Sequence, residues 1–321
     1  MRPAPRLVER IVRLADVFLA PFVYPAALLL KAIRRAGIRR MPFSRGALGH
    51  VGVFPIRDHY YEPLFNTSTL TDPAVERNLP GIDFNAPGQL RLLDTFVSPD
   101  EVRREFTDWQ GTPPFRFGNG SFESGDAEFW YQIVRSVKPA NIIEIGSGHS
   151  TLIATKAIAL NRRDDAAYTC NDICIEPYEA AWQAGTGPTV VRRKVETLPL
   201  DYFSILGEND VLFIDSSHII RPQGDVLFEF LQILPSLRKG VIVHIHDIFS
   251  PRDYLAKWLQ EDILFWNEQY LLEAFLTHNR DWEVIGALNY LRHHHYDDLK
   301  ARTPFLTPDR EPGSFYIRKV S

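Results

Sequence analysis

Polar side chains that could carry out chemistry follow two apolar runs in the second half of the chain. The run VLFI is followed by Asp215 and, three residues later, by His218, and the run VIVHI is followed by His246 and Asp247. Two carboxylates and an imidazole are suitable ligands for Mg²⁺ or Mn²⁺, and Fe²⁺ or Zn²⁺ would also accept them. An imidazole, with its ordinary pKa of about 6.5, can also take a proton from a hydroxyl group. The pattern therefore predicts metal ligands at Asp215, His246 and Asp247, and a catalytic pair of His218 as general base with Asp215.

Each of these residues also has an ordinary structural role open to it. His218 could cap a helix, and Asp215 and Asp247 could simply order the loops that they begin. His246 could be a packed residue at the end of a strand. His244 faces the same side as His246, because side chains alternate along a strand, and it lies deeper, so we expect a core residue there.

A second group of candidates has the sequence EIGSGHST and begins at Glu144. Gly146 and Gly148 allow a tight turn and close approach of the backbone to a ligand, and Ser150 or Thr151 can cap the helix that follows. A dinucleotide site would favour a third glycine where Thr151 stands. The carboxylate of Glu144 suits a cofactor with positive charge better than a phosphate. The pattern therefore predicts a cofactor loop that also includes Ser147.

Glu176 stands at the end of the next apolar run. A carboxylate in that place can accept hydrogen bonds from both hydroxyls of a ribose. Asp172, four residues earlier, is the alternative for this role. The sequence thus predicts a nucleoside-like cofactor beside the glycine turn.

These residues need a sheet to bring them together. After residue 114 the pattern alternates between strands and helices, which is typical of a doubly wound α/β fold. Because ligands bind beyond the carboxyl ends of the strands in such sheets, the candidates should share one edge. We expect a Rossmann-like, mostly parallel sheet of seven strands with helices on both faces. The expected strands are 141–146, 168–175, 189–193, 211–215, 240–246, 282–287 and 314–319, and the expected helices are 125–137, 150–160, 178–184, 224–237 and 265–279.

Five motifs in this order resemble one known class of enzymes. IIEIGSGHST, CIEPY, NDVLFIDSSH, GVIVHIHDIFSP and WNEQYLLEAFL are similar to segments of the class I S-adenosylmethionine-dependent methyltransferases. More narrowly, they resemble a bacterial family near the macrocin O-methyltransferase-like and cephalosporin-hydroxylase-like proteins. The likeness spans residues 117–318, about two thirds of the chain.

The resemblance implies S-adenosylmethionine as cofactor and O-methylation of a hydroxyl on a sugar or secondary metabolite, a small-molecule acceptor. Related metal-dependent enzymes carry an acidic pair after the fifth strand, whereas this chain has His246 in the first of those two places. The need for Mg²⁺ or another divalent cation is therefore open. The cofactor-binding residues implied are Asn119, Glu144, Gly146, Ser147, Gly148, Glu176 and Asp215.

Other functions remain as alternatives. A metal-dependent oxygenase or hydroxylase on the same fold would need O₂ and a reductant, and a catalytically inactive, membrane-associated scaffold would need neither. A Rossmann-like domain that binds no methyl donor is a further alternative. A Ser-His-Asp hydrolase of the α/β type is disfavoured because no G-x-S-x-G motif occurs.

Composition sets broad limits on the protein class. The 321 residues are 45% hydrophobic and 24% charged, as in ordinary globular proteins. A formal net charge of -4 argues against a general partner of nucleic acids. Two cysteines, Cys170 and Cys174, cannot staple a protein of this size, so we expect them to be reduced and structural, as in a cytoplasmic enzyme. The oligomeric state is open, and a homo-oligomer is one alternative.

The first 40 residues carry nine basic and two acidic side chains. Arg6, Arg10 and Arg13 share one face of an amphipathic pattern, which predicts a helix that ends before Pro21, with a second helix following from about Pro25. This hairpin either packs on protein or lies as a peripheral anchor on the inner face of a membrane. The uncharged run of 14 residues is too short and too broken by prolines to span a bilayer. The expected domains are residues 1–42 as this basic hairpin, 43–114 as an irregular cap with short helices, and 115–321 as the catalytic domain.

Overall fold

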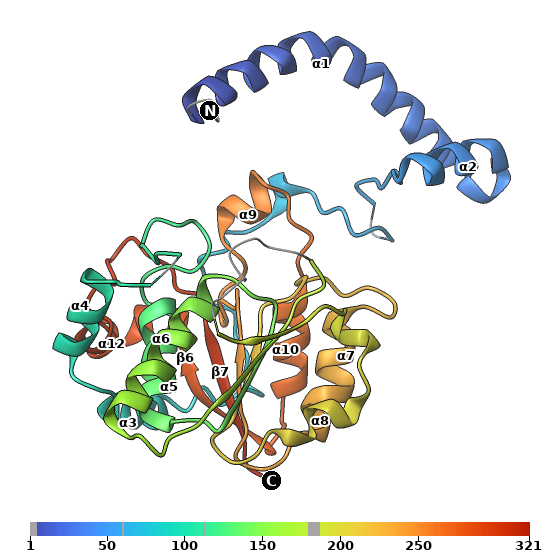
Figure 1. The fold of residues 1–321 in the computed structure, drawn as a ribbon. Coiled ribbons are helices and arrows are strands. Elements are labelled where there is room, and N and C mark those ends of the chain that lie inside the picture. Colours follow the sequence, from blue (N-terminus) through green and yellow to red (C-terminus); the bar gives the residue numbers. More distant parts are fainter. Residues whose placement is uncertain (1–4, 60, 112, 179–186) are drawn as a thin grey trace. The chain divides into compact units, whose positions relative to one another are not determined.

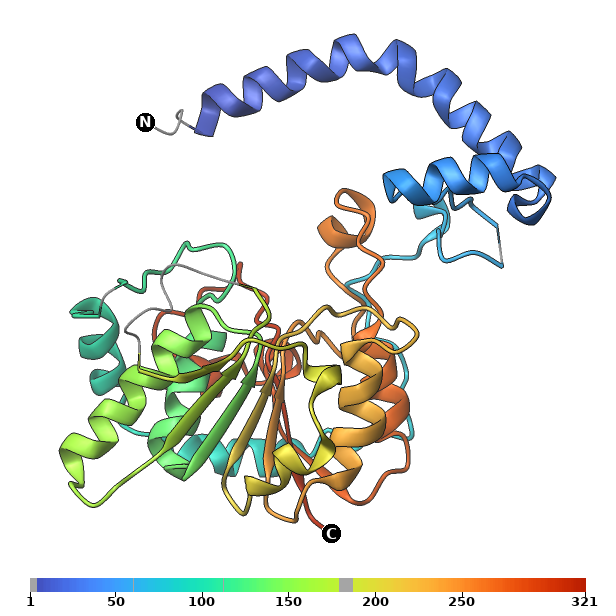
Figure 2. The same ribbon diagram turned by 45° about the vertical axis from the view of Figure 1, so that its right-hand side comes forward.

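The chain divides into two units, Met1–Thr71 and Asp72–Ser321. The structure is a computed structural model that describes residues 5–59, 61–111, 113–178 and 187–321. The segment expected as a cap, residues 43–114, is shared between the two units. The second unit is a sheet with helices on both of its faces (Figures 1 and 2).

Seven strands form one sheet in the order β3-β2-β1-β4-β5-β7-β6. All neighbours are parallel except β7, which runs antiparallel to both β5 and β6. Every expected strand is present, and the predicted Rossmann-like, mostly parallel fold is confirmed. The bounds are β1 Asn141–Ile145, β2 Asn171–Ile175, β3 Thr189–Val191, β4 Val211–Ile214, β5 Ile242–Ile245, β6 Trp282–Ala287 and β7 Phe315–Lys319.

The helices of the second unit agree with most of the expected ones. The expected helix 224–237 is a continuous helical run that includes a π-helical turn, Glu229–Ile233. The expected helix 178–184 falls on residues 179–186, apart from its first residue, and so lies outside the described residues. The α-helices are α3 Ala86–Asp94, α4 Pro99–Thr107, α5 Asp126–Val137, α6 His149–Asp164, α7 Asp225–Phe228, α8 Leu234–Ser236, α9 Ala256–Gln260, α10 Glu268–Leu276, α11 Leu288–His294 and α12 Tyr296–Arg302.

Two hydrophobic clusters cover the two faces of the sheet. Ile142 of β1 and Phe213 of β4 belong to the cluster that includes α5 and α6. Ile143 and Leu212, their neighbours on the same strands, belong to the cluster that includes α10 and the helical run 225–236. This alternation explains the continuous apolar runs, since a central parallel strand is buried on both sides.

The two cysteines lie inside this core. Cys170 and Cys174 are both buried and free, so the prediction that they are reduced and structural is confirmed. Burial raises the pKa of Cys170 to about 12. The thiol therefore stays neutral at physiological pH.

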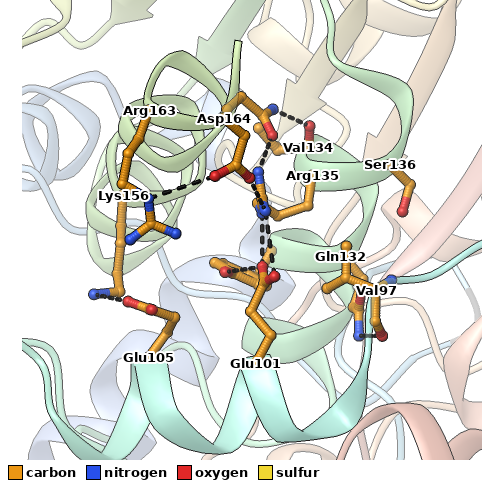
Figure 3. A network of polar contacts seen from close by, with 12 residues as sticks. Val97, Glu101, Glu105, Gln132, Val134, Arg135, Ser136, Lys156, Arg163 and Asp164 are labelled. Atoms are coloured by element: carbon orange, nitrogen blue, oxygen red, sulfur yellow. Dashed lines mark hydrogen bonds and ion pairs between the residues drawn. The ribbon is translucent and has the colours of Figure 1, made fainter.

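A buried arginine joins three helices on one face of the sheet (Figure 3). Arg135 of α5 donates to Glu101 of α4 at 2.7 Å and to Asp164 of α6 at 2.6 Å, and it also binds Asn161. Tyr131 donates a further hydrogen bond to Glu101 at 2.7 Å. Burial alone would raise the pKa of Glu101, but the hydrogen bonds from Arg135 and Tyr131 lower it. Glu101 therefore remains ionised and, through Arg135, holds α4 against α5 and α6.

We expect Arg135→Met to lower the free energy of unfolding by about 3 kcal/mol, because it leaves Glu101 half-buried without its cation. Denaturant unfolding of the full chain measures this change. Arg163→Met is the matched control: its guanidinium is 60% exposed and pairs with Asp164 at the surface, so about 0.5 kcal/mol or less is expected. Equal effects of the two substitutions would contradict the stabilising role of Arg135.

A single helix, α1 (Pro5–Ala36), stands where two helices were expected, so the predicted helical hairpin is wrong. The prediction depended on Pro21 and Pro25, because proline has no N–H to donate and often ends a helix. Here both prolines lie inside the helix, which bends along its length instead of breaking (Figure 1). Each proline removes one backbone hydrogen bond and leaves the ladder intact on either side. The helix α2, Pro42–Val51, follows.

A buried carboxylate holds the end of α1 within the first unit. The side chain of Glu62 is 3% exposed and accepts hydrogen bonds from Nε of Arg34 at 3.1 Å and Nε of Arg57 at 2.8 Å. Burial opposes ionisation, but the hydrogen bonds from Arg57 and Arg34 lower the pKa of Glu62 to about 2. Arg34 also lies over the ring of Phe54, 4.9 Å from its centroid. Arg34 is therefore engaged inside the unit.

Candidate active site

The turn after β1 leaves no room for a side chain. Gly146 has a φ of 88°, a conformation that favours glycine. A Cβ on Gly146 would lie 2.2 Å from the backbone oxygen of Asp215. The N–H of Asp215 in turn donates to the carbonyl of Ile145 at 2.9 Å. The ends of β1 and β4 therefore meet backbone to backbone at this glycine.

The rest of the turn is more open. Gly148 has an extended backbone, and a Cβ on it would meet no atom within 4 Å. Its N–H donates to the hydroxyl of Thr151 at 3.2 Å, so Thr151, one of the two predicted cap residues, does bind the start of the helix. Ser147 lies between the two glycines. Backbone around Ser147 and Gly148 is thus accessible to a ligand.

Glu144 lies beneath this turn. Its side chain is fully buried, and Oε2 accepts hydrogen bonds from the hydroxyls of Ser150 at 3.0 Å and Thr151 at 3.1 Å. Burial and then the charge of Asp172 raise the pKa of Glu144 well above its usual range. Burial raises the pKa of Asp172 to about 7. The geometry gives Glu144 a bracing role between β1 and α6, and its predicted contact with a cofactor stays a prediction.

A cavity of about 300 Å³ opens at the carboxyl ends of β1, β2 and β4. Three of the predicted cofactor residues line it, namely Gly146, Glu176 and Asp215, together with the basic side chains of Lys194 and Arg221. Glu176 accepts a hydrogen bond from the N–H of Tyr178 at 2.9 Å, which fixes its carboxylate at the end of β2. Asp172, the alternative to Glu176, lies outside this cavity, close to Glu144.

Asn119 uses its side chain inside its own turn. Its Oδ1 accepts from the N–H groups of Ser121 and Phe122, both at 2.9 Å, and its Nδ2 donates to the carbonyl of Phe122 at 2.8 Å. Ser121 lies 2.9 Å from Nδ1 of His149, the first residue of α6. Asn119 therefore shapes a loop that reaches the glycine turn through Ser121, and it does not line the cavity.

His218 is surrounded by three carboxylates. Its Nε2 lies 3.3 Å from Asp215 and 3.5 Å from Asp247, and its Nδ1 lies 2.9 Å from Glu268. His218 and Asp247 have φ values of 59° and 58°, which non-glycine residues seldom adopt. Such strained positions cluster at functional sites. The ends of β4 and β5 and the start of α10 thus meet at one imidazole.

The carboxylates set the protonation state of this histidine. Burial would lower the pKa of His218, but its hydrogen bonds with Asp215 and Glu268 and the charge of Asp247 raise it well above the usual value. Burial would raise the pKa of Asp215, but the hydrogen bond with His218 and the charges of nearby imidazoles lower it. Burial raises the pKa of Asp247. In this arrangement His218 holds a proton beside an ionised Asp215.

The histidine of this cluster is His218, whereas His246 was the histidine predicted as a metal ligand. Ligand atoms of Asp215, His218 and Asp247 lie within 4.8 Å of one another. The Nε2 of His246 is 3.7 Å from Asp247, and its ring packs on Phe122 with 5.0 Å between the centroids. The reason is strand alternation, since His246 continues the face of β5 that is turned toward the aromatic core.

His244 is a core residue, as predicted. It is fully buried and stacks on Phe213 with ring centroids 3.8 Å apart. Neither ring nitrogen has a hydrogen-bond partner within the described part of the chain. Burial lowers the pKa of His244 well below the usual value. This imidazole is therefore neutral.

Two buried glutamates lie behind His218, and neither was predicted to contact it. Glu268 opens α10 and is fully buried, and Glu229 opens the π-helical turn and is also fully buried. Glu229 accepts a hydrogen bond from the hydroxyl of Ser216 at 3.1 Å. Burial raises the pKa of both carboxyls. The sequence signal for Glu268 is only an acidic residue at a helix start, which is common for stability reasons alone.

Aromatic side chains form a wall beside His218. The ring of Trp266 lies 4.4 Å from that of His218, between centroids, and packs on Trp258 at 5.0 Å and Tyr254 at 6.3 Å. Both tryptophans are half-buried. They leave an apolar surface next to the polar cluster.

The donor set of the cluster fits a divalent cation. Asp215 and Asp247 supply carboxylate oxygens and His218 supplies Nε2. Glu268 holds the other ring nitrogen of His218, which is how ligating histidines are commonly oriented. The side chains of Asp215 and Asp247 are 37% and 18% exposed, so solvent can reach them.

Residues 143–248 match a family model described as a methyltransferase domain. The match runs from β1 to just beyond β5 and includes the glycine turn, the cavity and most of the His218 cluster. The chain carries a methyltransferase domain. The resemblance to class I S-adenosylmethionine-dependent methyltransferases is confirmed at this level, and the subfamily near the macrocin and cephalosporin-hydroxylase proteins stays a prediction.

Solved structures similar to this methyltransferase include O-methyltransferases, but the similarity is distant. TomG from Streptomyces achromogenes, in complex with SAM, is 12% identical, with 70% of this chain and 89% of that chain covered and a TM-score of 0.36. An O-methyltransferase from Bacillus cereus in complex with SAH is 12% identical, with 73% and 96% covered and a TM-score of 0.36. The structure described as cmcI-D160 Mg-SAM is 14% identical, with 62% and 73% covered and a TM-score of 0.34. No curated protein matches the chain. At these values the likeness supports no argument about substrate or metal.

Proposed function

We propose that this methyltransferase moves the methyl group of S-adenosylmethionine to a hydroxyl oxygen of a small molecule, such as a sugar or a secondary metabolite. The observation that carries the proposal is the position of Asp215 between the cavity and His218. It lines the cavity at the carboxyl ends of β1, β2 and β4, and it lies 3.3 Å from Nε2 of His218. A cofactor in the cavity would therefore present its methyl group next to a proton acceptor.

The cavity residues suit this cofactor. Glu176 would accept the two ribose hydroxyls, and the glycine turn would admit the cofactor close to the backbone of Ser147 and Gly148. Asp215 supplies negative charge near a positively charged sulfonium. The enzyme would then act mainly by positioning its two reactants for in-line displacement.

His218 would accept the proton of the acceptor. As the acceptor oxygen bonds to the methyl carbon, the carbon–sulfur bond breaks and the hydroxyl proton moves to Nε2 of His218. Glu268 stabilises the imidazolium that results, because it lies 2.9 Å from Nδ1. The raised pKa of His218 makes it a stronger base, and it also means that the enzyme becomes active only as pH rises far enough to deprotonate it.

A divalent cation would be held by Asp215, His218 and Asp247. Such an ion lowers the pKa of a coordinated hydroxyl and fixes its orientation. In that arrangement Nε2 of His218 would be a ligand of the ion and would not accept the proton. The oxygenase alternative gains no support from this set, since the iron triad of oxygenases has two histidines and one carboxylate.

The acceptor would rest against Trp266 and Trp258. Tryptophan faces bind apolar and aromatic rings and the apolar faces of sugars. Trp266 borders His218, and Trp258 packs on Trp266.

Residues 1–40 complete the proposal as a peripheral contact with the cytoplasmic face of a membrane. A homo-oligomer stays a prediction.

Calorimetric titration with S-adenosylhomocysteine, with and without Mg²⁺, tests the cofactor half. We expect micromolar binding, about −8 kcal/mol, and its loss in Glu176→Ala, because that carboxylate holds the ribose. Glu208→Ala, an exposed residue before the amino end of β4, is the control and should bind normally. Absence of binding by the unsubstituted chain under both conditions would overturn the methyltransferase proposal and favour the oxygenase or scaffold alternative.

A further inference from the structure

The charged side chains of α1 fall on one face of the helix, although its two basic ends are 18 residues apart in the sequence. On a helix that turns about 100° per residue, Arg10, Arg13 and Asp16 at one end and Lys31, Arg34 and Arg35 at the other share a sector of about 120°. This alignment exists only because α1 is continuous. Two separate helices of a hairpin would carry unrelated faces.

The opposite face of α1 is apolar along its whole length. Ile11, Phe18, Phe22 and Leu29 lie within about 40° of one another on the same wheel, and they are 57%, 74%, 72% and 62% exposed. Large exposed apolar surfaces of this kind mark a site of interaction. α1 therefore has one long apolar face and one charged face.

The dimensions of α1 favour a helix that lies along a bilayer over one that crosses it. The stretch Arg10–Ala36 is long and apolar enough to span a membrane by length and composition alone. Its uncharged part, Val17–Leu30, would cover only about 21 Å as a helix, against a hydrocarbon core of about 30 Å. A crossing would bury Arg13 and Asp16, or Lys31, in hydrocarbon. An in-plane helix buries none of them.

The prolines fit the same orientation. Pro21 leaves the carbonyl of Val17 without its helical N–H, and Pro25 does the same to the carbonyl of Pro21. On the wheel both carbonyl-bearing residues lie within or beside the charged sector. Water and headgroups can hydrate freed carbonyls there, whereas hydrocarbon cannot.

We propose that α1 lies in the plane of an anionic leaflet as one bent helix, with its apolar face in the acyl region and both basic ends among the headgroups. The inference rests on the proposed membrane contact and names its partner and geometry. Lys31, Arg35, Arg39 and Arg40 are exposed, while Arg34 is engaged by Glu62. This surplus of positive charge is complementary to the phosphate headgroups of an anionic membrane. A neutral protein surface would offer no such complementary charge.

Flotation with phosphatidylcholine vesicles, with and without phosphatidylglycerol, tests the partner. The full chain should float with the anionic vesicles. The double variant Lys31→Gln/Arg35→Gln should bind them roughly 30-fold more weakly, since each basic side chain near the surface contributes about 1 kcal/mol. Arg103→Gln/Arg163→Gln, which removes two exposed arginines of the second unit, is the matched control and should bind normally. Equal binding by the two double variants would overturn the proposal.

Depth measurements test the geometry. Single cysteines at Ile11, Phe22 and Leu29 carry a fluorophore, and lipids with quenchers at known depth report their positions; the native cysteines are buried. An in-plane helix gives equal depth at the three positions, whereas a spanning helix gives the greatest depth at Phe22. Unquenched labels, with an oligomer that dissociates on deletion of residues 1–40, would show that protein covers this face. Titration of the same samples with S-adenosylhomocysteine keeps failure here distinct from failure of the proposed enzyme activity.

Discussion

Gly146→Ala should strongly weaken binding of S-adenosylhomocysteine and also destabilise the fold. The added Cβ would lie 2.2 Å from the backbone oxygen of Asp215, and the φ of 88° is unfavourable for alanine. Because a backbone atom cannot rotate away, the ends of β1 and β4 must separate. We expect cofactor affinity to fall at least about 100-fold, or about 2.7 kcal/mol. Calorimetry measures the affinity, and denaturant unfolding measures the stability.

Gly148→Ala is the matched control, two residues away in the same turn. Its extended backbone suits alanine, and a Cβ there meets nothing within 4 Å. The free energy of unfolding should therefore stay unchanged. A loss of affinity without a loss of stability would support close approach of the cofactor to Gly148, whereas full affinity and stability in Gly146→Ala would contradict the close backbone contact described for that turn.

His218→Gln should lower kcat by roughly 100- to 10,000-fold, the usual contribution of a general base. The measurement is transfer of a radiolabelled methyl group to the hydroxyl acceptor that gives the highest rate with the unsubstituted chain. Affinity for S-adenosylhomocysteine should persist, because His218 does not line the cavity. His50→Gln, at the exposed end of α2, is the control. Full activity in His218→Gln would refute both the base and the ligand role.

Glu268→Gln separates a positioning role from a catalytic one. The hydrogen bond with Glu268 helps to raise the pKa of His218, so the neutral amide should lower that pKa. A general base works when deprotonated, and the rising limb of the pH profile should therefore move to lower pH. Nuclear magnetic resonance titration of His218 reports the same shift without an acceptor. A merely structural glutamate would leave both the profile and the titration in place.

The fold was predictable because its signal is local. Runs such as VLFID and VIVHIH are apolar on both faces only where a strand is covered on both sides, and the structure has each of these strands. The error at α1 came from the rule that an internal proline ends a helix. Pro21 and Pro25 each remove one hydrogen bond, which a long helix with intact turns on both sides tolerates.

The site was less predictable because its signal is not local. Glu268 lies 50 residues after His218 in the sequence, and nothing in the pattern of α10 joins the two. His246 was predicted as a ligand because it ends its strand at the same edge of the sheet as Asp215. Its side chain stays on the aromatic face of β5, whereas the positive φ of His218 and Asp247 redirects the chain at the strand ends. Gly146, Glu176 and Asp215, which line the cavity, could be predicted because glycine turns and polar residues at strand ends are visible in the sequence.

The neutral histidine in the core limits the acidity that the protein withstands. His244 stacks on Phe213 and lies near Trp130, Phe122 and Tyr316, while His246 is the nearby ionisable group. In the unfolded chain it binds a proton below about pH 6.5, but in the fold its pKa is much lower. Below about pH 6.5 the unfolded state therefore binds a proton that the native state does not bind. The free energy of unfolding decreases as the pH falls below this value. His218, in the adjacent cluster, has a raised pKa, so the same domain keeps two histidines in opposite charge states.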